Sequence, residues 1–173
     1  AAGHEVVDGK LTGPDGCDAA VDFTRPDAVG ANVERCLAGG VPVVIGTTGF
    51  DLDALREAAA GASANVFVAP NFAIGAVLMM RFAAEAARHM PECEIIELHH
   101  DRKVDAPSGT AMLTVERMAA ASDQWADDPT EKEVLAGARG ATGPGGIHVH
   151  AVRLRGLVAH QEVLLGTAGQ SLS

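Results

Sequence analysis

The stretch 97–111 holds the residues with the most chemical potential. His99, His100, Arg102 and Lys103 place four potential cations within five residues. An imidazole changes its charge near neutral pH and can therefore hold and release a proton. Lysine and arginine bind carboxylates and phosphates. The combination predicts a site that binds a small anion and moves a proton.

Two predicted elements position these side chains. Residues 94–98 alternate enough to predict a strand, so the two histidines fall at its end, where a loop lets side chains converge. Ser108 is a good N-cap residue and predicts a helix from Gly109 to about Ala121. The N-terminus of a helix favours a carboxylate or phosphate. We expect this helix start and the neighbouring cations to form one anion pocket.

Structural explanations compete with this interpretation. A His-His pair at a strand end is often only a hydrogen-bonded, half-exposed pair, and Arg102-Lys103 alone is typical of a solvated loop. A metal site is a third alternative. Adjacent strand residues point to opposite faces, however, and no cysteine or carboxylate stands at ligand spacing beside His99 and His100. The combination of residues favours the anion pocket without a metal.

Composition narrows the class of protein. The chain has 173 residues, of which 47% are hydrophobic, and no apolar run approaches membrane length. A net charge of −10 argues against a nucleic-acid partner. Cys17, Cys36 and Cys93 are widely spaced and indicate thiols rather than a disulfide framework, and no targeting signal precedes them. We expect a soluble cytoplasmic protein without membrane contact.

The first half of the chain alternates strands and helices. We expect strands at 19–23, 41–45 and 66–69, a helix capped by Thr24 that ends at Gly39-Gly40, and a second helix from Asp51 or Asp53 to about 61. Short loops join these elements. This order predicts an α/β fold with a partial doubly wound, Rossmann-like parallel sheet.

Ligands of such sheets collect beyond the carboxyl ends of the strands. Two loops occupy that position, and their candidate ligand-binding residues are Gly46, Thr47, Thr48, Ala69, Pro70, Asn71 and Phe72. A glycine lets a flat cofactor approach the backbone, hydroxyl and amide groups bond a ribose or carboxamide, and a phenyl ring offers an apolar face. Taken alone, these are ordinary turn residues.

The second half predicts an α+β domain with a mixed sheet. We expect a long helix at 74–90, a polar surface excursion at 122–133, and strands at 147–154 and 157–165 joined by a turn at 155–156. His148 and His150 would share one face of the first of these strands. Their period-two spacing fits metal ligands, although a solvated face or an inter-subunit contact is commoner.

The glycines at 140, 143 and 146 imitate a dinucleotide fingerprint. The real motif follows a strand and opens a helix, whereas this segment contains Pro144 and leads into a strand. We therefore interpret it as a glycine-rich loop, which could bring Arg139 towards a ligand.

The stretch 97–111, Glu-Leu-His-His-Asp-Arg-Lys-Val-Asp-Ala-Pro-Ser-Gly-Thr-Ala, resembles the signature of the dihydrodipicolinate reductase family. The segments 44–50, 69–75 and 153–162 agree with the same family. The resemblance implies hydride transfer from NADH or NADPH to the dehydrated form of 4-hydroxy-tetrahydrodipicolinate, giving tetrahydrodipicolinate for lysine and diaminopimelate synthesis.

The resemblance also implies roles for individual residues. His99 would be the general acid, and Lys103 a second proton donor that also stabilises the dianionic substrate. His100, Gly109 and Thr110 would bind that dicarboxylate, and the seven residues of the two strand-end loops would line the nicotinamide end of the cofactor. Residues 1–73 would form a partial dinucleotide-binding domain and residues 74–173 the substrate-binding and tetramerisation domain of a homotetramer.

The family's first strand, glycine-rich loop and helix have no counterpart here, nor does its last segment. We therefore expect an interior portion of a longer enzyme, and the choice between NADH and NADPH stays open. Two rival hypotheses remain. One is a noncatalytic fragment that keeps assembly and weak anion binding. The other is a metal-dependent hydrolase that uses His99, His100, His148 and His150.

Overall fold

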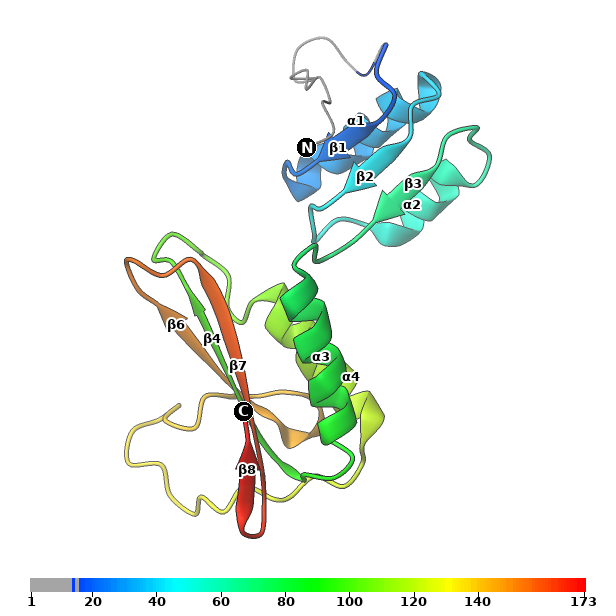
Figure 1. Ribbon diagram of the computed structural model, residues 1–173. Helices are drawn as coiled ribbons and strands as arrows, with labels where there is room; N and C mark the ends of the chain where they lie inside the picture. Colours follow the sequence, from blue (N-terminus) through cyan, green and yellow to red (C-terminus); the bar gives the residue numbers. More distant parts are fainter. Residues whose placement is uncertain (1–13, 15) are drawn as a thin grey trace. The chain divides into compact units, whose positions relative to one another are not determined.

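The computed structural model describes residue 14 and residues 16–173. The described residues form two compact units, and the division falls between Phe72 and Ala73. The first unit is a three-stranded parallel sheet with two helices (Figure 1). Its elements are β1 (Ala20–Asp22), α1 (Pro26–Ala38), β2 (Val43–Ile45), α2 (Leu52–Ala59) and β3 (Val66–Val68). The strands stand in the order β1-β2-β3, and the predicted Rossmann-like arrangement is confirmed.

Apolar side chains of the first unit gather between the helices and one face of its sheet. The buried cluster consists of Val29, Val33, Cys36, Val43, Ile45 and Leu55. Strand residues one position away, such as Val21 and Phe67, point to the other face and are exposed. Within the described residues, both helices therefore cover the same face of this sheet.

Asp22 is a buried carboxylate at the end of β1, and it decides how α1 begins. Its side chain accepts hydrogen bonds from the backbone and hydroxyl of Thr24, from Asn32 and from the hydroxyl of Thr47. The prediction that Thr24 is the N-cap is wrong by one residue. The hydroxyl of Thr24 is bound to Asp22 and does not cap the helix. Arg25 is the N-cap instead, without a side-chain cap, and Pro26 opens the helix.

The second unit is a five-stranded mixed sheet with two helices. Its elements are α3 (Ile74–Ala86), β4 (Glu92–His99), α4 (Gly109–Ala121), β5 (Ala141–Thr142), the short 3-10 helix η1 (Pro144–Gly146), β6 (His148–Arg153), β7 (Ala159–Thr167) and β8 (Gln170–Leu172). The strand order is β5-β6-β4-β7-β8. The central strand β4 runs parallel to β6 and antiparallel to β7. The predicted mixed sheet is therefore confirmed.

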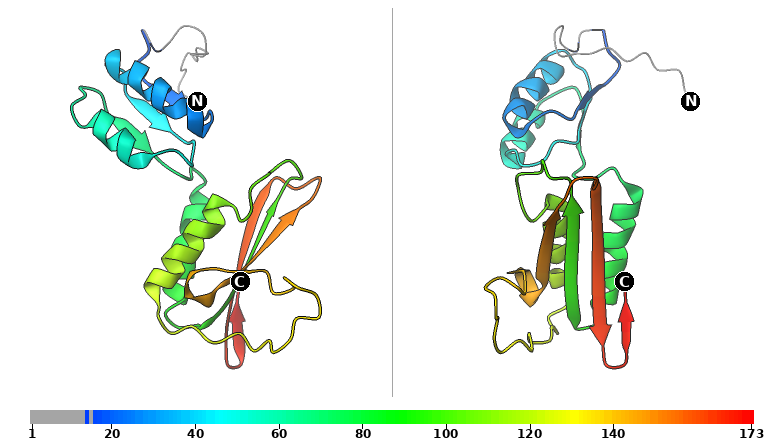
Figure 2. Two further views of the ribbon diagram at one scale, coloured as in Figure 1. Left: turned by 180° about the vertical axis from the view of Figure 1, so that it is seen from behind. Right: turned by 90° about the vertical axis from the view of Figure 1, so that its left-hand side faces the viewer.

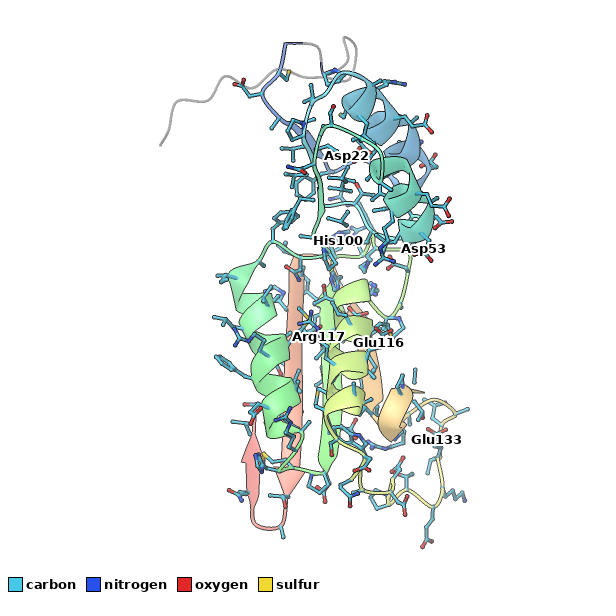
Figure 3. All side chains as sticks on the ribbon, turned by 90° about the vertical axis from the view of Figure 1, so that its right-hand side faces the viewer. Asp22, Asp53, His100, Glu116, Arg117 and Glu133 are labelled. Atoms are coloured by element: carbon cyan, nitrogen blue, oxygen red, sulfur yellow. The ribbon has the colours of Figure 1, made fainter. Side chains whose placement is uncertain are left out.

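Both long helices of this unit pack on one face of the sheet. They lie behind the strands in the right-hand view of Figure 2 and before them in Figure 3. The core between the two layers contains Ile95 of β4, Val149 of β6, Val163 of β7 and three residues of α4, namely Ala111, Val115 and Met118. No helix in the described part of the chain is both long and apolar enough to cross a membrane.

The bounds of several elements differ from those predicted. Helix α4 has the predicted bounds, whereas α3 ends at Ala86 rather than at residue 90. Strand β4 is longer than predicted and includes His99, and β8 was not predicted at all. It follows a turn at Gly169, whose φ of 81° is one that a glycine adopts without strain.

We predict that Asp22→Asn destabilises the first unit by about 1.5–3 kcal/mol, because the substitution removes the charge from a buried hydrogen-bond acceptor. Asp53→Asn is the matched control. Asp53 (labelled with Asp22 in Figure 3) forms an exposed ion pair with Arg56 and should contribute at most about 1 kcal/mol. Urea unfolding followed by circular dichroism measures the difference. The single tryptophan, Trp125, lies in the second unit and reports separately on that unit.

The same variants test the electrostatics of Asp22. Burial alone would raise the pKa of its carboxyl, but the hydrogen bonds from Thr24, Asn32 and Thr47 outweigh burial and lower this pKa below 3.8. The ionised form therefore stabilises the folded state fully above pH 3.8, and this contribution is lost as the pH falls through the lowered pKa. Asp22→Asn should lack this loss, and an unchanged acid limb would contradict the assignment.

Candidate active site at the carboxyl end of β4

Glu97 is the centre of the candidate site and is fully buried, with 0% of its surface exposed. Four hydrogen bonds satisfy its carboxylate. Arg153 donates from both terminal nitrogens, at 2.9 Å to Oε2 and 2.8 Å to Oε1. The Nδ1 atom of His99 lies 2.5 Å from Oε2, and the backbone N–H of Ser108 lies 3.1 Å from Oε1. A strand, its parallel neighbour and a helix start thus meet at one carboxylate.

The strand register brings these groups together. Glu97 and His99 stand two residues apart on β4 and therefore point to the same face of the sheet, towards α3 and α4. Arg153 pairs with His99 in the parallel β4–β6 ladder. Ser108 caps α4 by accepting a hydrogen bond from Ala111 with its hydroxyl, and its own N–H is left to reach Glu97.

Opposing effects act on the ionisation of Glu97. Burial favours the neutral carboxyl, whereas the hydrogen bonds and positive charges of Arg153 and His99 favour the carboxylate and outweigh it. The net result lowers the pKa of Glu97 below its ordinary value of 4.5. The group is therefore ionised at neutral pH despite having no contact with water.

The two histidines have different surroundings. His99 is the last residue of β4, and 16% of its side chain is exposed. With Nδ1 directed at Glu97, its Nε2 atom is the one left for a ligand. His100 lies just beyond the strand, where Nδ1 accepts the backbone N–H of Arg102. Its own backbone N–H and carbonyl bond to Val158 and Lys103.

Lys103 is held by an acidic neighbour in the same loop. Its ammonium lies 2.8 Å and 2.7 Å from the two carboxylate oxygens of Asp105. The hydrogen bond from Lys103 lowers the pKa of Asp105. Arg153 also donates to the backbone carbonyl of Asp105, at 2.6 Å. One connected network therefore joins the predicted catalytic residues His99 and Lys103 through Glu97, Arg153 and Asp105.

Sequence reasoning missed Glu97 and Arg153 as members of this site, although a signal was present. Glu97 stands two residues after Ile95 and therefore shares a strand face with it, so it is expected to be buried, and a buried carboxylate needs a cation or several hydrogen bonds. Acidic partners also offset two of the four predicted cations, since Glu97 pairs with His99 and Asp105 with Lys103. Gly109 and Thr110 open α4 beside this network.

A second charged cluster lies at the opposite end of β4. Glu94 binds the guanidinium of Arg139 and lies 2.6 Å from Nε2 of His150. Asp128 lies 3.3 Å from Arg139 and 3.1 Å from His148. Figure 3 shows the loop of Glu133, which binds the backbone of Arg139, at the far end of the sheet from His100. Arg139 thus belongs to this cluster, and its partner Glu94 lies about 16 Å along β4 from His99.

This separation bears on the metal-site alternative. His148 and His150 lie with Asp128 and Glu94 rather than with His99 and His100. Among the described residues, no three histidine, cysteine, aspartate or glutamate side chains form a group that could hold a metal ion. Cys93 is also unsuited to be a nucleophile, because burial and the nearby charge of Glu94 raise its pKa to about 12.

The residues predicted to contact a cofactor lie at one edge of the first unit's sheet, after β2 and β3. A Cβ at Gly46 would come within 2.0 Å of the Phe23 ring, so this glycine makes room for a side chain of the protein itself. The Thr47 hydroxyl donates to Asp22. Phe72 is half-exposed, and its ring centroid lies 5.4 Å from that of Phe23.

Comparisons with known proteins agree along the chain. Residues 3–72 match the family model "Dihydrodipicolinate reductase, N-terminus", and residues 75–173 match "Dihydrodipicolinate reductase, C-terminus". The 4-hydroxy-tetrahydrodipicolinate reductase of Desulfitobacterium hafniense is 50% identical over 160 residues, covering 90% of this chain and 60% of the relative. For the enzyme of Cutibacterium acnes, the identity is 50% over 173 residues, with 95% and 70% coverage.

A solved structure shows the same fold. The dipicolinate-bound dihydrodipicolinate reductase of Paenisporosarcina sp. TG-14 is 47% identical, with a TM-score of 0.71 over 90% of this chain and 60% of that chain. The chain therefore spans about 60% of the length of the first of these relatives and of this structure. On the two family-model matches and these identities, the chain belongs to the dihydrodipicolinate reductase family.

Proposed function

We propose that this chain carries out the chemistry of a 4-hydroxy-tetrahydrodipicolinate reductase. The reaction transfers a hydride from NADH or NADPH to the dehydrated form of 4-hydroxy-tetrahydrodipicolinate and serves lysine and diaminopimelate synthesis. The observation that carries the proposal is the network around Glu97, which joins His99 and Lys103 beside the N-terminus of α4. Proton donors and anion-binding groups are thereby gathered in one unit.

The first unit offers groups that fit the nicotinamide end of a pyridine nucleotide. Phe72 presents an exposed ring for a flat heterocycle, and the exposed Thr48 and the amide of Asn71 offer polar atoms. Backbone groups of Gly46, Thr47, Ala69 and Pro70 complete the predicted set. A bound pyridine nucleotide would supply the hydride.

The second unit offers groups that suit a ring with two carboxylates. Lys103 and His100 are cations or hydrogen-bond donors, and Gly109 and Thr110 belong to the first turn of α4, where N–H groups favour an anion. The name of the structure from Paenisporosarcina includes bound dipicolinate, a ring of this class. We assign one carboxylate to Lys103 and His100 and the other to Gly109 and Thr110.

His99 is assigned the role of general acid. Reduction of a conjugated imine leaves electron density on a second ring carbon, and a proton placed there lowers the barrier. The Nε2 atom of His99 is available for this transfer because Nδ1 is engaged by Glu97. Lys103 stabilises the negative charge of the substrate and is the candidate second proton donor.

We predict that Lys103→Ala weakens dipicolinate binding about 10- to 100-fold, as loss of a charge-assisted hydrogen bond should. Isothermal titration calorimetry measures this on the chain itself. Arg102→Ala is the control, because Arg102 is exposed and adjacent to Lys103 in the same loop, and it should change the affinity less than threefold. Equal losses in the two variants would reduce Lys103 to a nonspecific charge.

For His99→Gln, we predict a fall in kcat of about 10²- to 10⁴-fold in the complete enzyme, with dipicolinate affinity nearly unchanged, because a general acid acts in the chemical step. Stopped-flow oxidation of NADH measures turnover. Normal turnover of His99→Gln would remove this residue from the proton transfer. Dipicolinate binding without NADH binding or turnover in the wild type would support the noncatalytic alternative.

We also propose that the complete enzyme is a homotetramer assembled through the helix-free face of the second unit's sheet. That face carries both polar and apolar residues. The apolar residues are Ile96, Leu98, Val152 and Leu164. The fold leaves this face without a helix in the described part of the chain (Figure 2). Analytical ultracentrifugation should give a tetramer that Leu98→Glu dissociates, and a wild-type monomer would contradict the proposal.

A further inference from the structure

We propose that Glu97 and Arg153 act as a positioning pair that fixes the ring orientation of His99 and makes Nε2 its proton-transferring atom. Neither residue has to touch the substrate. The structural part of this inference stands on the contacts of Glu97 alone, and its catalytic consequence rests on the proposed function of His99.

The contact with Glu97 places a proton on Nδ1 of His99. An ionised carboxylate only accepts hydrogen bonds, so a contact of 2.5 Å between Oε2 of Glu97 and Nδ1 of His99 requires the proton on Nδ1. The other nitrogen is then unprotonated in the neutral ring and gains the second proton in the imidazolium. The tautomer of a histidine is set in this way by the hydrogen bond of its other nitrogen.

Arg153 keeps the carboxyl of Glu97 ionised. Without a cation, the fully buried Glu97 would tend to bind a proton, and a neutral carboxyl can donate a hydrogen bond to Nδ1 and reverse the tautomer. The two hydrogen bonds from Arg153 keep the carboxylate ionised and hold its orientation. The backbone carbonyls of Val152 and Asp105 in turn hold the guanidinium.

Other charged groups surround the same corner of the unit. The loop after β4 contributes His100, Lys103 and Asp105, β6 contributes Arg153, and α4 contributes the N–H groups of its first turn. A variant of Glu97 could therefore alter proton transfer through one of these groups. The effect is assigned to the pair of Glu97 and His99 only if it disappears when His99 is also replaced.

The proton balance of the step is simple. The Nε2–H of the imidazolium gives its proton to the electron-rich carbon of the substrate, whose electron pair forms the new C–H bond. His99 becomes neutral and keeps its Nδ1–H on Glu97, which remains a carboxylate throughout. A proton from solvent restores the imidazolium before the next turnover.

The chain provides a matched control on the same strand. Glu94 also binds one histidine and one arginine, but at the opposite end of β4. Glu94→Gln therefore removes a carboxylate with the same types of partner without touching His99. Glu94 is 29% exposed and lies on the other face of the sheet, so this variant controls for the loss of a charged partner on β4 and not for the loss of a buried charge.

The first measurement is the tautomer of His99, read from ¹⁵N chemical shifts of the imidazole at a pH where the ring is neutral. We expect Nδ1–H in the wild type and in Glu94→Gln, and a loss of this preference in Glu97→Gln, whose amide can present N–H groups to the ring. Wild-type His99 in the Nε2–H form would overturn the proposal. The wild-type measurement needs neither cofactor nor activity nor a variant. The tautomer of His99 in the wild type therefore tests the proposal even if Glu97→Gln fails to fold.

The second measurement is a double-mutant cycle in the complete enzyme. Glu97→Gln should lower kcat on the order of 10²-fold with little change in KM, and it should have no further effect in a His99→Gln background. Additive losses would show that Glu97 does not act through His99. If His99→Gln were fully active, the proposed function of His99 would fail, while the tautomer result would still judge the positioning pair.

Discussion

A carboxylate that has no contact with water needs hydrogen-bond donors from the protein. Glu97 imposes this constraint on the second unit. Its four hydrogen bonds come from His99 of β4 itself, from Arg153 of the parallel strand β6 and from Ser108, the N-cap of α4. Breaking such a buried ion pair costs about 3–5 kcal/mol, because the remaining charge is left unpaired. The arrangement that supports the fold at this point is therefore the one that holds the proposed acid.

Two other carboxylates of the chain, Asp22 and Glu94, also obtain hydrogen bonds from the protein, but in different surroundings. Asp22 in the first unit is nearly as buried, but neutral hydroxyl, amide and backbone donors satisfy it. Glu94 has a histidine and an arginine as partners, as Glu97 has, yet 29% of its side chain remains exposed. Water therefore screens the Glu94 cluster more strongly than the Glu97 network. This difference favours the Glu97 end of the strand for chemistry that needs fixed geometry.

Local signals predicted much of the fold. Ser108 and the helix it caps were placed to the residue, since capping depends only on neighbours in sequence, and the parallel sheet of the first unit followed from its alternation of strands and helices. The pairing of Glu97 with Arg153 could not be found in this way, because the two residues are 56 positions apart. Periodicity predicts which face a side chain occupies, but the partner on that face depends on strand register. Thr24 shows the converse, since a tertiary acceptor, Asp22, displaced a good local cap.

The salt bridge between Lys103 and Asp105 has a consequence for selectivity. The ammonium already has an anion of its own chain, held by two short contacts, so an incoming ligand must displace or share a resident competitor. A single carboxylate that binds Lys103 therefore gains less free energy than the new contact alone would give, because the contact with Asp105 is lost or shared. Asp105 thus lowers the affinity of this ammonium for any anion that has no second contact in the site.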